Sequence, residues 1–221
     1  YRPKTFAVRL KKGNVKAAPI KNIPLQLPFN SKAFTPENFG YTVSFDKKGN
    51  SFAAELIGDK VTCDNITFSI ADHENKNVIK CKGDTIQLPK EAAGKKLYIL
   101  AASTDKDRKS TFLVNGKSHE FEIPYYSGFY GQWGHKGVSD GYIRNASLAY
   151  IGSHRHTEKG NDTYISTYMY KLGIELPQEA HTLVLPKDEN IAVFAITLSD
   201  NYIDDISTAN EMRTLPLEVS K

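Results

Sequence analysis

VTCDNITFSI, residues 61–70, is the stretch that decides the fold class. Its residues Ile66, Phe68 and Ile70 alternate with polar residues, which is the side-chain period of a β-strand with one buried face. Similar runs, rich in β-branched and aromatic residues, occur through most of the chain. They predict further strands at 5–10, 41–45, 77–81, 85–88, 96–103, 110–115, 119–126, 164–176, 181–185 and 191–198.

Turn residues separate these runs, and helix signals are weak. Asn115-Gly116 is the strongest hairpin signal, because both residues tolerate the positive φ of a type I′ turn. The segments 51–59 and 208–213 could each form a helical turn or two, but neither carries an apolar stripe. Many short strands with regular turns predict an all-β fold: an antiparallel β-sandwich, jelly-roll or galactose-binding-like, with little helix.

Composition and charge exclude two classes of partner. The 221 residues are 40% hydrophobic, which is enough for a sizeable core. A formal net charge of +4, spread along the chain, is too weak for a nucleic-acid-binding surface. No run approaches the about 18 consecutive apolar residues of a membrane-spanning helix. We therefore expect neither a nucleic acid nor a membrane as a partner.

The chain begins at Tyr1 with a strand-like run and without an initiator Met or a signal segment, as an excised piece of a longer protein would. We expect residues 1–20 to be a terminal strand and linker from a preceding domain, and residues 21–221 to be the β-sandwich domain. A sub-boundary near 127 is left open. Cys63 and Cys81 fit either a cross-strand disulfide or two buried thiols.

YYSGFYGQWGH, residues 125–135, combines closely spaced aromatic residues with small and polar spacers. Flat rings beside an amide suit a sugar, so Tyr130, Gln132 and Trp133 are candidate sugar contacts. The alternative is core packing between two sheets, for which bulky strand residues are also needed. Exposure of Trp133 distinguishes the two interpretations.

SHRH, residues 153–156, places two histidines on one strand face. His154 and His156 would project together, as two imidazole ligands of one metal would. No third ligand is evident, so we predict no metal site and no cofactor in this chain. Residues that could complete a site only if the fold brought them close are His135, Glu158 and Asp162.

Arg155, between the two histidines, has two interpretations. A carboxylate such as Glu158 or Asp162 could anchor it in polar packing under a loop. Alternatively, His154, Arg155 and His156 could together donate hydrogen bonds to sugar hydroxyls.

Enzyme signatures are missing from the sequence. It contains no G-x-S-x-G, no phosphate-binding glycine loop, no HExxH and no Cys-x-x-Cys motif. Nothing in the spacing of Glu55, Asp72, Asp84 or Glu175 selects an acid/base pair. No catalytic residue is predicted.

Several strings together resemble one family. The most specific is SHRHTEKGNDTY at 153–164, followed by YMYKLGIELPQEAHTLVLPKDENIAVFAITL at 168–198. They resemble the C-terminal β-rich region of bacterial α-mannosidases of glycoside hydrolase family 38. Shorter strings that add to the resemblance are LPFN at 27–30, FDKKGNSFAAEL at 45–56, NVIKCKGDTIQLP at 77–89, LYILAAST at 97–104 and GQWG at 131–134.

The resemblance implies a non-catalytic accessory domain, inactive alone, of an enzyme that hydrolyses terminal α-mannosyl linkages. The zinc ion and nucleophile of that enzyme would belong to a missing catalytic domain of the same chain, which this domain would brace. His154, Arg155 and His156 would face its cleft and contact a mannose-containing glycan. A periplasmic or otherwise exported location is implied as well. The alternative is an independent carbohydrate-binding module.

Overall fold

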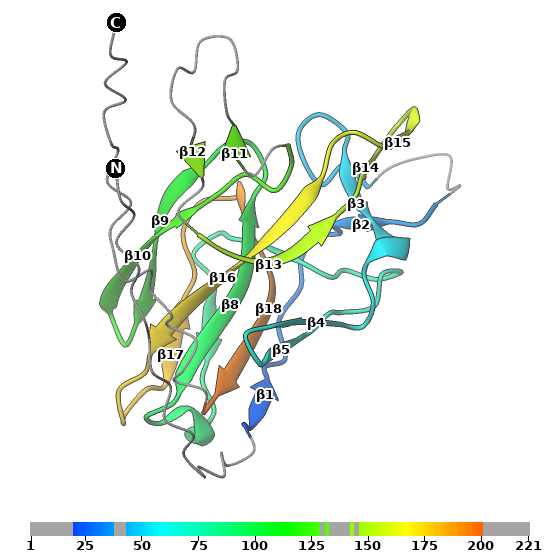
Figure 1. Ribbon diagram of the computed structural model, residues 1–221. Helices are drawn as coiled ribbons and strands as arrows, with labels where there is room; N and C mark the ends of the chain where they lie inside the picture. Colours follow the sequence, from blue (N-terminus) through cyan, green and yellow to red (C-terminus); the bar gives the residue numbers. More distant parts are fainter. Residues whose placement is uncertain (1–19, 38–42, 129–130, 133–141, 144–145, 201–221) are drawn as a thin grey trace, which may run out of the picture.

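A computed structural model describes residues 20–37, 43–128, 131–132, 142–143 and 146–200 (Figure 1). The described residues form β-strands and two short 3₁₀ helices, η1 (Ala54–Leu56) and η2 (Lys90–Ala92), and contain no α-helix. The prediction of an all-β fold with little helix is therefore confirmed. The described part of the chain contains no helix long and apolar enough to cross a membrane. The predicted elements at 5–10 and 208–213 lie outside the described residues.

The central sheet is antiparallel and contains the longest strands. Its order is β1-β18-β8-β16-β13, and β6 also pairs with β18. Every residue of β8 and of β18 is buried, because other sheets cover both faces of these strands. The strand bounds are β1 (Asn22–Pro24), β6 (Ile79–Lys80), β8 (Lys96–Ser103), β13 (Ser147–Gly152), β16 (Thr167–Glu175) and β18 (Ile191–Ser199).

A second antiparallel sheet, in the order β10-β9-β17-β7, packs on one face of the central sheet. Asn115 and Gly116 join β9 to β10 with φ values of 48° and 82°, which confirms the predicted hairpin. The strands of this second sheet are β7 (Thr85–Gln87), β9 (Arg108–Val114), β10 (Lys117–Ile123) and β17 (Thr182–Val184).

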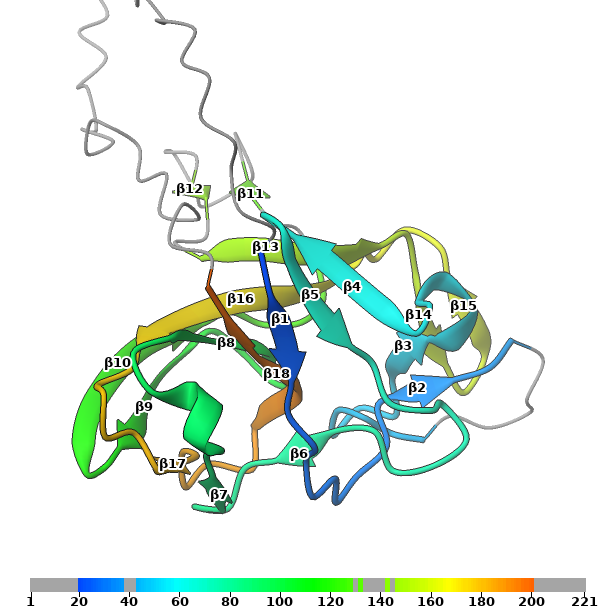
Figure 2. The same cartoon turned by 90° about the horizontal axis from the view of Figure 1, so that it is seen from below.

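On the other face, β15-β14-β3-β2 form a small sheet in which only β2 and β3 run parallel. Figure 2 shows this sheet and the β4–β5 hairpin on the opposite side of β8 and β18 from β9, β10 and β17. The remaining strands are β2 (Phe34–Thr35), β3 (Ser51–Ala53), β4 (Lys60–Cys63), β5 (Ile66–Ser69), β11 (Gly131–Gln132), β12 (Tyr142–Ile143), β14 (Arg155–Thr157) and β15 (Gly160–Asp162).

Two apolar cores follow from the alternation along β8. Tyr98 and Leu100 belong to the core on the side of β3 and β5, whereas Leu97 and Ile99 belong to the core on the side of β9 and β17. A strand that is apolar on both faces therefore separates two packed layers, as in a β-sandwich with an additional small sheet.

Three local predictions differ from the structure. Residues 61–70 form the hairpin β4–β5 instead of one strand, because Asp64 and Asn65 turn the chain with φ values of 51° and 63°. Within 51–59, a strand precedes a single 3₁₀ turn. Residues 43–45 of the predicted strand 41–45 form no strand, and residues 41–42 lie outside the description.

Neither cysteine is in a disulfide, so the disulfide alternative is wrong. Cys81 is buried, and Cys63 is partly exposed at the end of β4. The domain boundaries at residue 20 and near 127 stay predictions, and residues 1–19 lie outside the described part of the chain.

Candidate metal centre

The two histidines of the SHRH segment lie on the same side of the chain, as their spacing predicts. His156 is in β14 and His154 precedes it, and their ring centroids are 5.4 Å apart. Cross-strand pairing of β14 with β3 sets His156 opposite Ser51. The same pairing sets Arg155 opposite Phe52, so His154 lies toward the end of β3 at Ala53, where the next segment begins.

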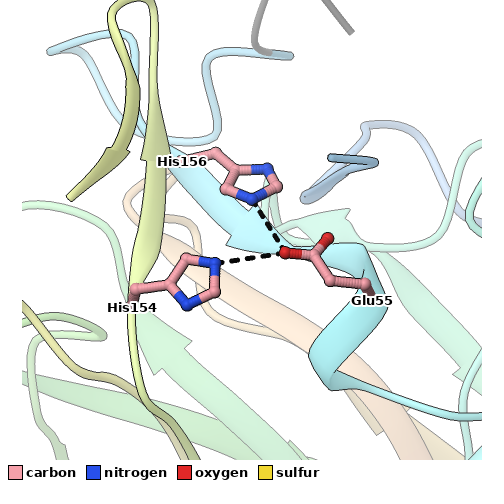
Figure 3. Close-up of side chains that lie close together, drawn as sticks. All are labelled: Glu55, His154 and His156. Atoms are coloured by element: carbon pink, nitrogen blue, oxygen red, sulfur yellow. Dashed lines mark hydrogen bonds and ion pairs between the residues drawn. The ribbon is translucent and has the colours of Figure 1, made fainter. Parts of the chain in front are cut away.

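Glu55 meets both imidazoles from that neighbouring segment. It lies in η1, the single turn that follows β3 directly. Its Oε1 atom is 3.1 Å from His154 Nε2 and 3.0 Å from His156 Nε2 (Figure 3). One potential ligand atom from each residue lies within 4.8 Å of the other two. The turn of η1 thus brings a carboxylate over a pair of histidines that are far from it in sequence.

The cluster is partly open to solvent. The side chain of His156 is 5% exposed, that of His154 is 13% exposed and that of Glu55 is 30% exposed. The two imidazoles are therefore largely enclosed by the protein, while the Glu55 side chain is partly in contact with solvent.

Neighbouring polar groups orient the cluster. His154 Nδ1 lies 3.3 Å from Ser153 Oγ, a hydroxyl that can donate to or accept from the ring according to the imidazole tautomer. The Tyr150 hydroxyl donates a 3.3 Å hydrogen bond to the Leu56 carbonyl, at the end of η1. Burial, and then the nearby Glu55 carboxylate, raise the pKa of Tyr150 to about 12. Tyr150 therefore stays a neutral donor that tethers η1 above the histidines.

The donor set and its spacing fit a transition metal. Two imidazole nitrogens and one carboxylate oxygen are a ligand set found in zinc sites. Atoms bound to zinc at about 2.1 Å lie about 3.0 Å apart at right angles and about 3.4 Å apart at the tetrahedral angle. The 3.0 and 3.1 Å separations from Glu55 Oε1 are close to both values, so small side-chain shifts would admit an ion.

The sequence did not identify the third ligand. Asp162 accepts hydrogen bonds of 3.1 and 2.9 Å from Arg155 Nε and Nη2, so it does not face the histidines. Glu158 lies beside Gly49, and His135 is outside the described residues. In the sequence, Glu55 is one of several scattered carboxylates, because no local spacing connects it with residues about 100 positions later.

Arg155 is turned away from the histidines. Besides its bonds to Asp162, its Nη1 donates to Ser127 Oγ at 3.4 Å. The prediction that a carboxylate anchors Arg155 in polar packing is therefore confirmed. These bonds hold the β14–β15 hairpin, so Arg155 supports the strand that presents the histidines.

The candidate sugar contacts are only partly described. Tyr130 and Trp133 lie outside the described residues, and Gln132 is described only as part of β11. Tyr126 is fully buried and its hydroxyl donates to Asp46 Oδ2 at 2.8 Å, so this part of the aromatic segment is core. Contact of His154, Arg155 and His156 with sugar stays a prediction.

The fold and the cluster define a β-sandwich domain with a candidate two-histidine, one-glutamate metal centre. The sequence profile of the AziU2-like beta-sandwich domain matches residues 21–202, so the chain belongs to that family. No curated protein matches the chain.

The resemblance to α-mannosidases of glycoside hydrolase family 38 is therefore wrong. The strings that carried it are alternating strands separated by turn residues, a pattern that any β-sandwich requires. The resemblance therefore no longer supports the expectations that were based on it. These are a mannosyl-hydrolysing parent enzyme, a zinc-bearing catalytic domain, contact with a mannose-containing glycan and export.

Proposed function

We propose that this β-sandwich domain is a metal-binding module that holds one Zn²⁺ ion through Glu55, His154 and His156. The observation that carries the proposal is the convergence of both Nε2 atoms on one carboxylate oxygen, at 3.0 and 3.1 Å. Hydrogen bonds within a histidine–carboxylate cluster also occur without metal, so the proposal rests on the ligand set together with its access to solvent.

The ligand chemistry favours zinc or a neighbouring transition metal over magnesium or calcium. Mg²⁺ and Ca²⁺ take six or more oxygen ligands, whereas this cluster offers two nitrogens and one carboxylate. Structural zinc sites are usually closed by four protein ligands, and three protein ligands leave a position for water or an exogenous molecule. Among the described residues, the cluster supplies three ligands.

Zinc titration of the metal-free 221-residue chain, followed by calorimetry, tests this function. We expect one ion per chain, and a loss of affinity of at least about 100-fold in His156→Ala and Glu55→Ala. His181→Ala is the matched control, because His181 is exposed in a loop before β17. At zinc concentrations 100 times the dissociation constant, linkage stabilises the fold by about 2.7 kcal/mol and raises Tm by about 5–10 °C.

Two outcomes would contradict the proposal. One is the absence of saturable zinc binding by the folded parent protein. The other is equal zinc affinity in His156→Ala and His181→Ala. Addition of mannose to the zinc-free protein in the same instrument tests the separate prediction of carbohydrate binding.

A further inference from the structure

An open groove adjoins the metal centre. Its cavity has a volume of about 660 Å³, within the range of sites for small organic molecules. Glu55 lines it from η1, and the opposite walls are residues 70–74 after β5 and residues 36–37 after β2. Glu55, one of the three proposed metal ligands, is thus also part of the groove wall.

The histidine-bearing face of the β14–β15 hairpin meets the same groove. Asn161 lies directly opposite His156 in the antiparallel pair, so the two side chains project from one face. Asn161 Nδ2 donates to Glu37 Oε1 at 3.5 Å, and Glu37 lines the groove. Glu37 and Glu55 therefore connect the groove with the side of the hairpin on which the metal would lie.

The groove is acidic although the chain as a whole has a net charge of +4. No lysine or arginine is among its lining residues, but Lys60 lies 3.9 Å from Asp59 and Lys32 Nζ donates to the Glu74 carbonyl oxygen. Burial lowers the pKa of His73, so its imidazole does not offset the negative charge near neutral pH. The five carboxylates that line the groove are Glu37, Glu55, Asp59, Asp72 and Glu74.

Three of these carboxylates already have other roles. Glu55 faces the histidines, and Asp72 accepts hydrogen bonds from the Glu74 backbone N–H at 3.0 Å and from Asn75 Nδ2 at 2.8 Å. Asp59 is exposed and lies 3.9 Å from Lys60. Glu37 accepts a hydrogen bond from Asn161, so Asp59 and Glu74 are the groove carboxylates that can face a cationic ligand. The apolar residues Ile57 and Ile70 also line the groove.

The metal and the groove present opposite charges. A Zn²⁺ ion with one carboxylate and two neutral imidazoles keeps a charge of about +1, which favours an anionic oxygen donor in the open position. A simple anion would be repelled by the groove carboxylates. A molecule with an anionic oxygen at one end and an ammonium group at the other is favoured by both charges.

We propose that the metal centre binds a dipolar amino-acid-like molecule, whose anionic oxygen coordinates the metal and whose ammonium group lies in the acidic groove. The inference rests on the proposed zinc site. It assigns the open coordination position to the ligand and the groove carboxylates to its cationic end.

Two matched probes test the inference on the full chain loaded with Co²⁺, whose visible spectrum reports a change of ligands. The probes are 6-aminohexanohydroxamate and hexanohydroxamate, which differ only in the terminal amine. We expect both to change the Co²⁺ spectrum, and the amine to bind at least about threefold more tightly. This preference is expected to disappear in the double variant Asp59→Asn, Glu74→Gln and to persist in Glu175→Gln, on β16.

Each outcome has a separate meaning. Failure of Co²⁺ to bind overturns the proposed function and this inference with it. A Co²⁺ spectrum that neither hydroxamate changes leaves metal binding intact and shows a closed structural site, which overturns the inference. Equal affinity for the two probes, or a preference unaffected by the double variant, overturns the role of the groove.

Discussion

Two buried threonines in different strands of the central sheet predict opposite effects of the same substitution. Thr167 in β16 and Thr197 in β18 are both fully buried. Thr167 Oγ1 has no hydrogen-bond partner among the described residues, whereas Thr197 Oγ1 donates to the Thr67 carbonyl at 2.9 Å. Replacement by valine keeps the shape of each side chain and removes the hydroxyl.

The expected magnitudes follow from these contacts. A buried hydroxyl without a partner costs about 1–3 kcal/mol, so Thr167→Val is expected to stabilise the fold by about 1–2 kcal/mol. The hydroxyl lies close to Gly152, where an added Cβ would come within 2.5 Å of Thr167 Oγ1, so the methyl group of valine also contacts this glycine. Thr197→Val loses one hydrogen bond and is expected to destabilise the fold by about 1 kcal/mol.

Urea unfolding and thermal unfolding, both followed by circular dichroism, measure the two effects. For a domain of this length, each kcal/mol shifts Tm by about 2–4 °C. The two variants should therefore lie on opposite sides of the parent protein. If Thr167→Val is no more stable than the parent while Thr197→Val is less stable, the Thr167 hydroxyl has a partner and the reasoning is refuted.

Two further predictions concern the cysteines and an acid-sensitive ion pair. Burial raises the pKa of the Cys81 thiol far above its usual range. A thiol reagent should therefore modify only Cys63 in the native chain and both cysteines in urea. Rapid modification of Cys81 in the native chain would contradict this prediction. Hydrogen bonds from Arg108 lower the pKa of Asp105 to about 2. Because its folded-state pKa lies below the unfolded-state value, Asp105 stabilises the fold near pH 7, and this contribution disappears between about pH 5 and pH 2. Asp105→Asn should lower the free energy of unfolding near pH 7 by less than about 1 kcal/mol, because solvent screens the Asp105–Arg108 pair. The difference in urea midpoint between this variant and the parent protein should vanish near pH 2. A difference that does not depend on pH would contradict the assignment.

Much of the local architecture could be predicted from the sequence. The long runs at 96–103 and 191–198 form strands, and Asn115-Gly116 forms the hairpin turn. These features depend on side-chain period and on residues that tolerate positive φ, which are local properties. Side-chain period alone predicts one strand over 61–70, but Asp64 and Asn65 form a turn that divides it into the hairpin β4–β5.

The family resemblance shows the limit of short strings. Alternating strands with proline or glycine turns recur in unrelated β-sandwiches, since each must bury one face of each sheet. The profile over residues 21–202 assigns the chain to the AziU2-like beta-sandwich domain, which individual strings such as LPFN could not do.

The candidate metal centre shows the same division between local and tertiary information. The sequence alone determined that the chain is all-β and that His154 and His156 share one face, because strand periodicity is a property of the backbone. Only the tertiary structure decided that Glu55 completes the cluster and that Arg155 turns away to Asp162. The pairing of β14 with β3 joins segments about 100 residues apart, and the contacts made by such a pairing depend on the packing of the whole sandwich.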